Sequence, residues 1–164
     1  MSKAPSILLV LLGLPISGQE AANLNQLMRG VFYPPSNVVF SAQSDNPGDA
    51  KPTPGEDPSM ATDPLKSTFG GWQAVENAAL ALTEAASLLL IPGRSCANGV
   101  AAPIESSDWA RFVQELRAAG LKAYKAAQSK DQDKMVDAAD TLSVACAACH
   151  RKWRDRPRGV ERCK

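Results

Sequence analysis

Hydrophobic residues recur at steps of three and four along four segments of the chain, the spacing that places them on one face of a helix. In the first segment, residues 20–31, this face comprises Leu24, Leu27, Met28 and Val31. Gly30 and the adjacent Pro34 and Pro35 discourage continuation, because proline lacks a backbone donor and disfavours helix in the residue before it. We therefore expect a short first helix.

Three longer helices are expected at residues 70–91, 107–128 and 130–156, each with the same spacing. The apolar face of the first comprises Trp72, Val75, Ala79, Leu82, Ala86 and Leu89. The second has Trp109, Val113, Leu116, Gly120, Ala123 and Ala127, and the third has Met135, Ala139, Leu142, Cys146, Cys149 and Trp153. Ser129, followed by Gln132 three residues later, predicts a capping box at the start of the last helix.

Short connections between the last three helices favour antiparallel neighbours. The predicted fold is all-α: an antiparallel up-and-down four-helix bundle with a long irregular connection between the first and second helices. Within that connection, residues 46–64 are rich in proline, glycine and acidic residues and should form a surface loop. No alternating pattern of useful length predicts a strand.

The first eighteen residues have the pattern of a secretory signal peptide. Lys3 precedes the apolar residues 7–16, and the small residues Ser17 and Gly18 follow. The apolar stretch is about half of the roughly 20 residues that a membrane-spanning helix requires, which disfavours the alternative of a membrane anchor. We expect residues 1–18 to be removed, leaving residues 19–164 as a single exported, soluble domain of the periplasm or an equivalent compartment, without a membrane span.

The composition argues against one class of function, nucleic-acid binding, and is compatible with a bound cofactor. The chain has 18 basic and 17 acidic residues, so there is no basic excess of the kind that binds nucleic acid. Only nine residues are aromatic. A core built mainly from small side chains leaves room for a bulky cofactor at native packing density.

The motif C-x-x-C-H at Cys146, Cys149 and His150 is the arrangement that attaches c-type haem. Two cysteine thiols form thioethers to the vinyl groups, and the adjacent imidazole binds the iron. Steps of three and four residues bring both sulfur atoms and the imidazole to one face of a helix. The sequence therefore predicts one covalent haem c.

Two other uses of these cysteines are disfavoured. A thioredoxin-like pair needs its first cysteine near a helix N-terminus, whereas Cys146 lies late in its predicted helix. A zinc site would require Cys96 and Cys163 as further ligands, and these two lack the local spacing of zinc ligands.

The C-terminal sequence CAACHRKWRDR, on the last of four helices, resembles that of the class II c-type cytochromes, the cytochrome c-prime family. The likeness covers about residues 70–156. It implies a monohaem four-helix bundle in which Arg154, after the motif, contacts the cofactor; Trp153 is expected to pack in the haem pocket. The segment of residues 32–64 and the cysteine pair Cys96 and Cys163 depart from the pattern of the family.

The sixth iron ligand is expected to be Met28. His150 is the only histidine, which excludes two histidine ligands from one chain. Met60 lies in the proline-rich loop, and Met135 precedes His150 by fifteen residues on the same helix. The low-spin branch of class II resembles this arrangement, with a methionine of the first helix opposite the histidine. The alternative is that Met28 is an ordinary core residue.

The expected function is that of a one-electron carrier rather than an enzyme, because the chain has no second histidine for acid–base chemistry. The alternative is a five-coordinate haem protein that binds NO or CO. The basic residues of segment 151–164 either complement the helix dipole and the haem propionates or dock an acidic redox partner protein. The sequence leaves both a monomer and a homodimer as alternatives.

A disulfide between Cys96 and Cys163 is also predicted. In an up-and-down bundle the second and fourth helices run in the same direction, so residues just past their ends meet at one end of the molecule. The alternatives are two free thiols or pairing between chains.

Overall fold

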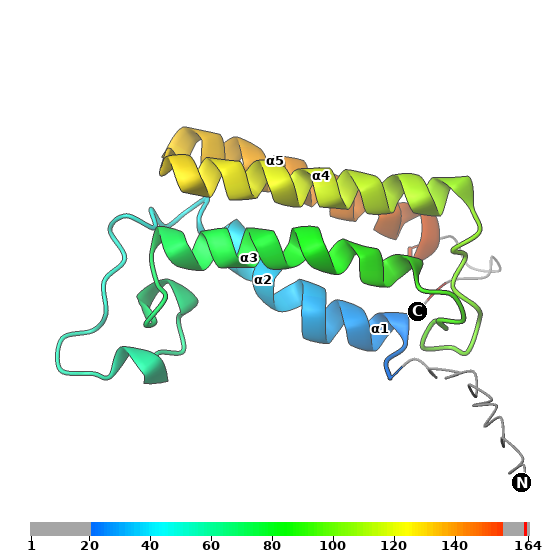
Figure 1. The fold of residues 1–164 in the computed structure, drawn as a ribbon, viewed down its shortest axis with the longest axis horizontal. Coiled ribbons are helices and arrows are strands. Elements are labelled where there is room, and N and C mark those ends of the chain that lie inside the picture. The colour runs from blue at the N-terminus through cyan, green and yellow to red at the C-terminus, as the bar shows by residue number, and fades with distance from the viewer. Residues whose placement is uncertain (1–20, 156–162, 164) are drawn as a thin grey trace, which may run out of the picture.

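The computed structural model describes residues 21–155 and 163, and within these ranges it is helical with no β-strand (Figure 1). The predicted signal peptide, residues 1–18, lies outside the described residues. The helices are α1 (Leu24–Leu27), α2 (Tyr33–Ser41), α3 (Trp72–Ala85), α4 (Ser107–Ser129) and α5 (Gln132–Trp153). The π-helical turn Met28–Phe32 joins α1 to α2, so that four helical segments pack together.

The first helical segment differs from the prediction at both ends. It begins at Leu24, because the side chain of Asn23 accepts a hydrogen bond from the backbone N–H of Gln26, and the backbone N–H of Asn23 donates one to the side-chain oxygen of Gln26. It then continues through the two prolines to Ser41, ten residues beyond the expected end at residue 31. The expectation of a short helix was therefore wrong.

The π-helical turn explains why the prolines are tolerated. The N–H of Tyr33 bonds to the carbonyl of Met28, a step of five residues. Pro34 and Pro35 then occupy the first turn of α2, where proline is accommodated because the backbone N–H groups need no partner within the helix.

The three longer predicted helices are present with adjusted ends. The segment expected at residues 70–91 is α3 followed by the 3-10 helix Ala86–Leu90. The last helix begins after Asp131, whose side chain accepts a hydrogen bond from Lys134 N. Ser129 instead ends α4, and Lys130 follows in the left-handed conformation. The predicted Ser129–Gln132 capping box was therefore wrong.

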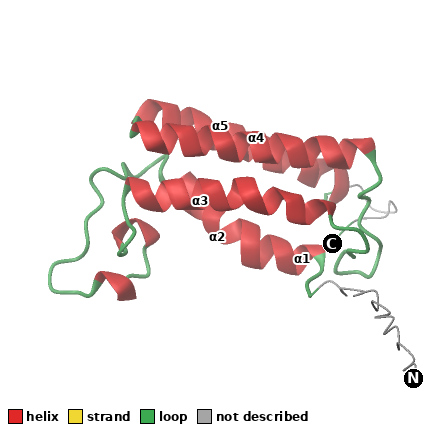
Figure 2. Ribbon diagram, viewed as in Figure 1, coloured by secondary structure: helices red, strands yellow, loops and turns green. Residues whose placement is uncertain are grey.

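The connection from α2 to α3 spans residues 42–71 and extends from one end of the helices, while the α3–α4 connection lies at the other end (Figure 2). It contains two short 3-10 helices, Pro58–Met60 and Pro64–Lys66, each capped by an aspartate side chain. The predicted loop at residues 46–64 is thus irregular apart from these turns.

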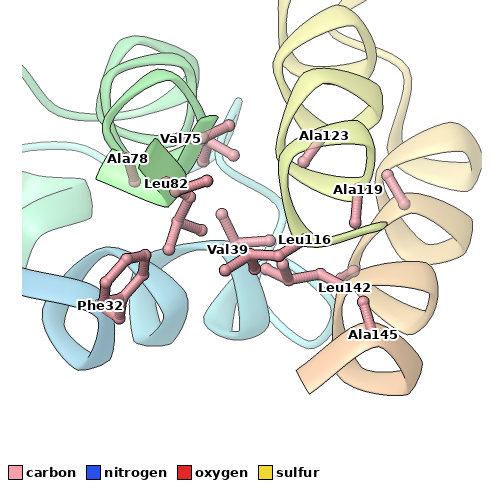
Figure 3. Close-up of a cluster of buried hydrophobic side chains, with 14 of the residues drawn as sticks. Phe32, Val39, Val75, Ala78, Leu82, Leu116, Ala119, Ala123, Leu142 and Ala145 are labelled. Atoms are coloured by element: carbon pink, nitrogen blue, oxygen red, sulfur yellow. The ribbon is translucent and has the colours of Figure 1, made fainter. Parts of the chain in front are cut away.

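The core lies where α3 packs against α4 and α2, and α4 against α5. Figure 3 shows side chains from these helices meeting in one cluster. The fully buried members include Val39 of α2, Val75 and Leu82 of α3, and Leu142 of α5. Many positions between them are alanine, which lets the helices approach closely but fills little volume. Within the described part of the chain, no helix combines the length and the apolar character that crossing a membrane requires.

Candidate functional site

A cavity of about 720 Å³ lies between the first helical segment, α4 and α5. Its walls include all six residues that sequence analysis assigned to a haem: Met28, Cys146, Cys149, His150, Trp153 and Arg154. Cofactor and small-molecule sites typically have volumes of about 300–1,000 Å³ and mainly apolar walls with a few polar groups. The cavity has the size and the residue types of such a site.

The α5 wall carries the chemical groups of the C-x-x-C-H motif. Cys146, Cys149 and His150 lie in the last two turns of α5, partly buried, and all three line the cavity. Neither cysteine forms a disulfide. The helical steps of three and four residues thus place two thiols and an imidazole in the wall of a single cavity.

Burial shifts the pKa of each of these groups in the direction that disfavours its charged form. It raises the pKa of the Cys149 thiol to about 11, with smaller contributions from the charges of Cys146 and Glu115. It also raises the pKa of Cys146. The pKa of His150 is lowered, first by burial and then by the charge of Arg154, against an opposing effect of Asp155. Protonated thiols are not the activated thiolates of a redox pair, and a neutral imidazole is the form that binds a metal.

The opposite wall comes from the first helical segment. Met28 begins the π-helical turn, is partly buried and lines the cavity. Phe32, Ser36 and Phe40 follow it along the same wall. π-Helical turns are frequent at functional sites. A regular α-helix resumes directly after this turn, at Tyr33.

Sequence analysis missed this aromatic wall. It assigned residues 32–64 to an irregular connection because of the two prolines. The steps of four from Phe32 to Ser36 and from Ser36 to Phe40 were the available signal, since they match the period of a helical face.

Two tryptophans form another part of the lining. Trp109 of α4 and Trp153 of α5 meet edge to face, with ring centroids 6.1 Å apart. The indole N–H of Trp109 donates to the carbonyl oxygen of Leu89 at 2.8 Å, which satisfies its polar atom inside the core. Trp153 therefore lies in the cavity wall in contact with Trp109, which lines the same cavity; its packing against a haem stays a prediction.

Charged residues are confined to the exposed rim of the cavity. Arg154 donates two hydrogen bonds to the carboxylate of Asp155, at 2.7 and 2.9 Å. Arg29 is exposed on the first helical segment and also belongs to the lining. A cofactor with an apolar body and anionic groups at its edge matches this distribution, because the apolar part is buried and the charges face solvent.

The donor set fits a c-type haem better than a bare metal ion. Two thiols, one imidazole and one thioether are the groups needed for two covalent links and two axial ligands. Among the described residues there is no group of three or more His, Cys, Asp and Glu side chains placed to hold a metal ion. The four-thiolate zinc alternative is also lost, because Cys96 and Cys163 are bonded to each other.

The predicted pairing of Cys96 and Cys163 is found at disulfide distance, with their Cα atoms 4.9 Å apart. Cys96 is buried and lies between α3 and α4, while Cys163 is partly buried and contributes to the cavity lining. The basic segment 151–164, expected either to complement the helix dipole and the haem propionates or to dock a partner, extends into residues 156–162 and 164, which lie outside the described residues.

Comparison of the chain with protein-family models, with curated proteins and with solved structures finds no match.

Proposed function

We propose that this chain is an exported monohaem c-type cytochrome that carries single electrons, with haem bound to Cys146 and Cys149 and iron bound by His150 and Met28. The observation that carries the proposal is the meeting of Met28 with the C-x-x-C-H groups around one cavity, although they lie at opposite ends of the sequence. The proposal includes a single domain of residues 19–164 with the antiparallel up-and-down helix order of class II cytochromes.

A bound haem supplies an iron atom that cycles between the ferric and ferrous states. The chain's own residues would hold the haem and set its reduction potential. The thioethers of Cys146 and Cys149 would fix its position, and the neutral imidazole of His150 is suited to bind the iron. The thioether of Met28 is a soft ligand, and methionine paired with histidine raises the reduction potential. The apolar side chains of Trp153 and Phe32 in the cavity wall would lower the polarity around the haem, which would further favour the less charged ferrous form.

The second candidate function is binding of NO or CO at a five-coordinate haem. The extent of the cavity favours it, because the lining continues from Met28 to Phe40, twelve residues further along the first helical segment. Apolar space beside an open iron site would accept a diatomic gas. In this alternative Met28 only lines the cavity.

Covalent attachment is tested by producing the full chain in a bacterial host that exports it and attaches c-type haem. Denatured protein should retain haem on a gel. The variant Cys146→Ala with Cys149→Ala should lose it, whereas Val144→Ala, an exposed change on the same helix, should keep it. Covalent haem in the double-alanine variant would refute the assignment.

Absorption spectra separate the two functions. If Met28 binds the iron, wild-type protein is low-spin and Met28→Ala becomes high-spin. Met60→Ala is the matched control, because Met60 is 79% exposed in the loop between α2 and α3. A high-spin wild-type spectrum that Met28→Ala leaves unchanged would reject electron transfer through a histidine–methionine haem and favour gas binding.

Partner recognition is part of the same proposal. The rim residue Arg29, together with Arg151 on the exposed surface of α5, would attract an acidic redox partner towards the cavity opening. The rate of electron exchange with such a partner should fall as salt concentration rises. Alternatively, the surface at the cavity opening forms a homodimer. Analytical ultracentrifugation of the purified chain distinguishes a monomer from a dimer.

A further inference from the structure

Three consecutive residues of the α3–α4 connection join the beginning of the first helical segment to the end of the chain. The carbonyl of Ser95 accepts a hydrogen bond from Leu24 N, the first residue of α1, at 2.8 Å. The buried guanidinium of Arg94 donates to the carbonyl of Ala22. These two residues therefore attach the connection to the start of α1.

The next residue attaches the same connection to α5. Cys96 forms the disulfide with Cys163, and Cys163 N donates to the carbonyl of Trp153 at 3.1 Å. Trp153 is the last residue of α5. We call residues 94–96 with Cys163 the clamp. It links the helical segment that carries Met28 to the helix that carries His150.

The clamp lies close to both proposed iron ligands. Met28 is four residues after Leu24, and His150 is three residues before Trp153, which correspond to about 6 Å and about 4.5 Å along a helix axis. Leu24 and Cys163 both line the cavity themselves. A change in the clamp would therefore move the end of the cavity at which the two ligands lie.

The main helix–helix packing does not set this spacing directly. The close helix packing is between α2 and α3, α3 and α4, and α4 and α5, whereas α1 and α5 lie on opposite sides of the cavity. Away from the clamp, the first helical segment and α5 are linked directly at their other end, where Gln132 Nε2 donates to the carbonyl of Ala42 at 2.7 Å, and the π-helical turn packs on α3. At the ligand end, α1 and α5 are linked through the clamp, and a helix end held by a few direct contacts is the kind of element that opens locally at low cost in free energy.

We propose that the Cys96–Cys163 disulfide is a positioning element for Met28, and that reducing it releases Met28 from the iron and opens the sixth coordination site. The inference rests on the proposed haem function and deepens it. The protein would carry electrons with the disulfide closed and would bind a diatomic gas with the disulfide open. Both functions considered for the cavity then belong to one chain, separated by the state of the clamp.

A dithiol supplies the two electrons and two protons that reduction of the disulfide requires. A thiolate of the dithiol attacks one sulfur atom of the disulfide, and its second thiolate resolves the mixed disulfide. The S–S bond breaks, Cys96 and Cys163 each gain one proton and one electron, and the dithiol leaves as its own disulfide. Cys163 is partly exposed, whereas Cys96 is 1% exposed, so attack is expected at the Cys163 sulfur.

The test measures the affinity of the ferrous, haem-loaded full chain for CO, so that the oxidation state of the iron is constant. Allosteric coupling typically changes affinity by about 5- to 150-fold. Treatment with dithiothreitol, and separately the variant Cys96→Ser with Cys163→Ser, should raise CO affinity within that range. The absorption spectrum without CO should change from six-coordinate to five-coordinate. Reoxidation of the treated wild type should restore both readings.

The decisive control is the same treatment in a Met28→Ala background. If the disulfide acts by positioning Met28, its reduction there leaves CO affinity unchanged, whereas a general loosening of the cavity raises it in both backgrounds. A second variant, Arg94→Met, breaks the other arm of the clamp with the disulfide intact and should also raise CO affinity. It provides the test if the double-serine variant does not fold, as judged by far-UV circular dichroism.

Three results would overturn the inference. They are an unchanged six-coordinate spectrum after reduction, an equal response in the Met28→Ala background, and a wild-type haem that is five-coordinate while the disulfide is closed. The first two leave both covalent haem and its Met28 ligand in place, whereas the third leaves covalent haem in place but also rejects the proposed electron carrier in favour of gas binding. Absence of covalent haem from the wild type would instead refute the proposed function.

Discussion

The close approach of α3 and α4 can be tested at Gly120, where even a methyl group lacks space. A Cβ atom at this position would lie 2.6 Å from Thr83 Oγ1 and 3.1 Å from Thr83 N. Thr83 is 3% exposed, and its hydroxyl donates to the carbonyl of Ala79 at 2.8 Å, which fixes its orientation. Gly120→Ala therefore requires α3 and α4 to separate.

Two effects of opposite sign determine the result. Alanine is favoured over glycine within a helix by about 0.8–1.0 kcal/mol. Overpacking a core costs about 1–3 kcal/mol, and the upper part of that range applies because the new atom meets both side chain and backbone of Thr83. The net loss in the free energy of unfolding is about 1–2 kcal/mol. For a chain of this size, this lowers the melting temperature by about 2–8 °C.

Thermal unfolding of the full chain, followed by far-UV circular dichroism, measures the effect. Gly30→Ala is the matched control, because Gly30 is also helical but has no neighbouring atom within 4 Å of the added Cβ. Its melting temperature should stay the same or rise. In a Thr83→Ala background, where the hydroxyl is absent, Gly120→Ala should lose less stability, since residues in contact are energetically coupled.

An equal rise in melting temperature for Gly120→Ala and Gly30→Ala would refute this reasoning. It would mean that helix propensity outweighs the contact and that α3 and α4 are further apart than the structure places them. An unchanged loss in the Thr83→Ala background would show that the Thr83 hydroxyl is not the obstacle.

Two further predictions concern α5. Leu142→Ala should lower the free energy of unfolding in urea by about 2–5 kcal/mol because Leu142 is fully buried, whereas Val144→Ala, at a side chain 62% exposed, should change it by less than about 0.5 kcal/mol. Asp131→Ala should lower the melting temperature by removing the N-terminal cap of the helix. The pKa of Asp131 is lowered by the Lys134 ammonium and by the backbone N–H of Lys134, so its stabilisation is present above the ordinary pKa of 3.8 and disappears as pH falls through the lowered value. Melting curves at a series of acidic pH values should therefore converge for wild type and Asp131→Ala; a constant difference would contradict the cap.

The three long helices could be predicted because their signals are local. The helix predicted at residues 107–128 ends one residue before the observed end of α4 at Ser129. The start of α5 was misplaced because Ser129 and Asp131 both have side chains that can cap a helix. Asp131 is the cap in the structure, because Lys130 adopts the left-handed conformation that ends α4 and α5 can begin only after it.

The first helical segment shows where local signals were insufficient. Pro34 and Pro35 predict an end to the helix only if their missing N–H groups were needed as donors. The π-helical turn before them removes that requirement, and burial of Phe32 and Val39 in the core stabilises the continuation. Whether this burial is available depends on α3, which lies beyond a long connection and whose position no local pattern reports.

For the candidate site, the sequence alone determined that Cys146, Cys149 and His150 share one helical face, because the period of the helix is set by its backbone hydrogen bonds. It also indicated Met28 and the cysteine pair. Only the tertiary structure decided what that face meets: a cavity whose opposite wall is the π-helical turn and α2, and a clamp at the end of that cavity. These contacts join segments far apart in the chain, and their geometry follows from how whole helices pack rather than from the residues beside each motif.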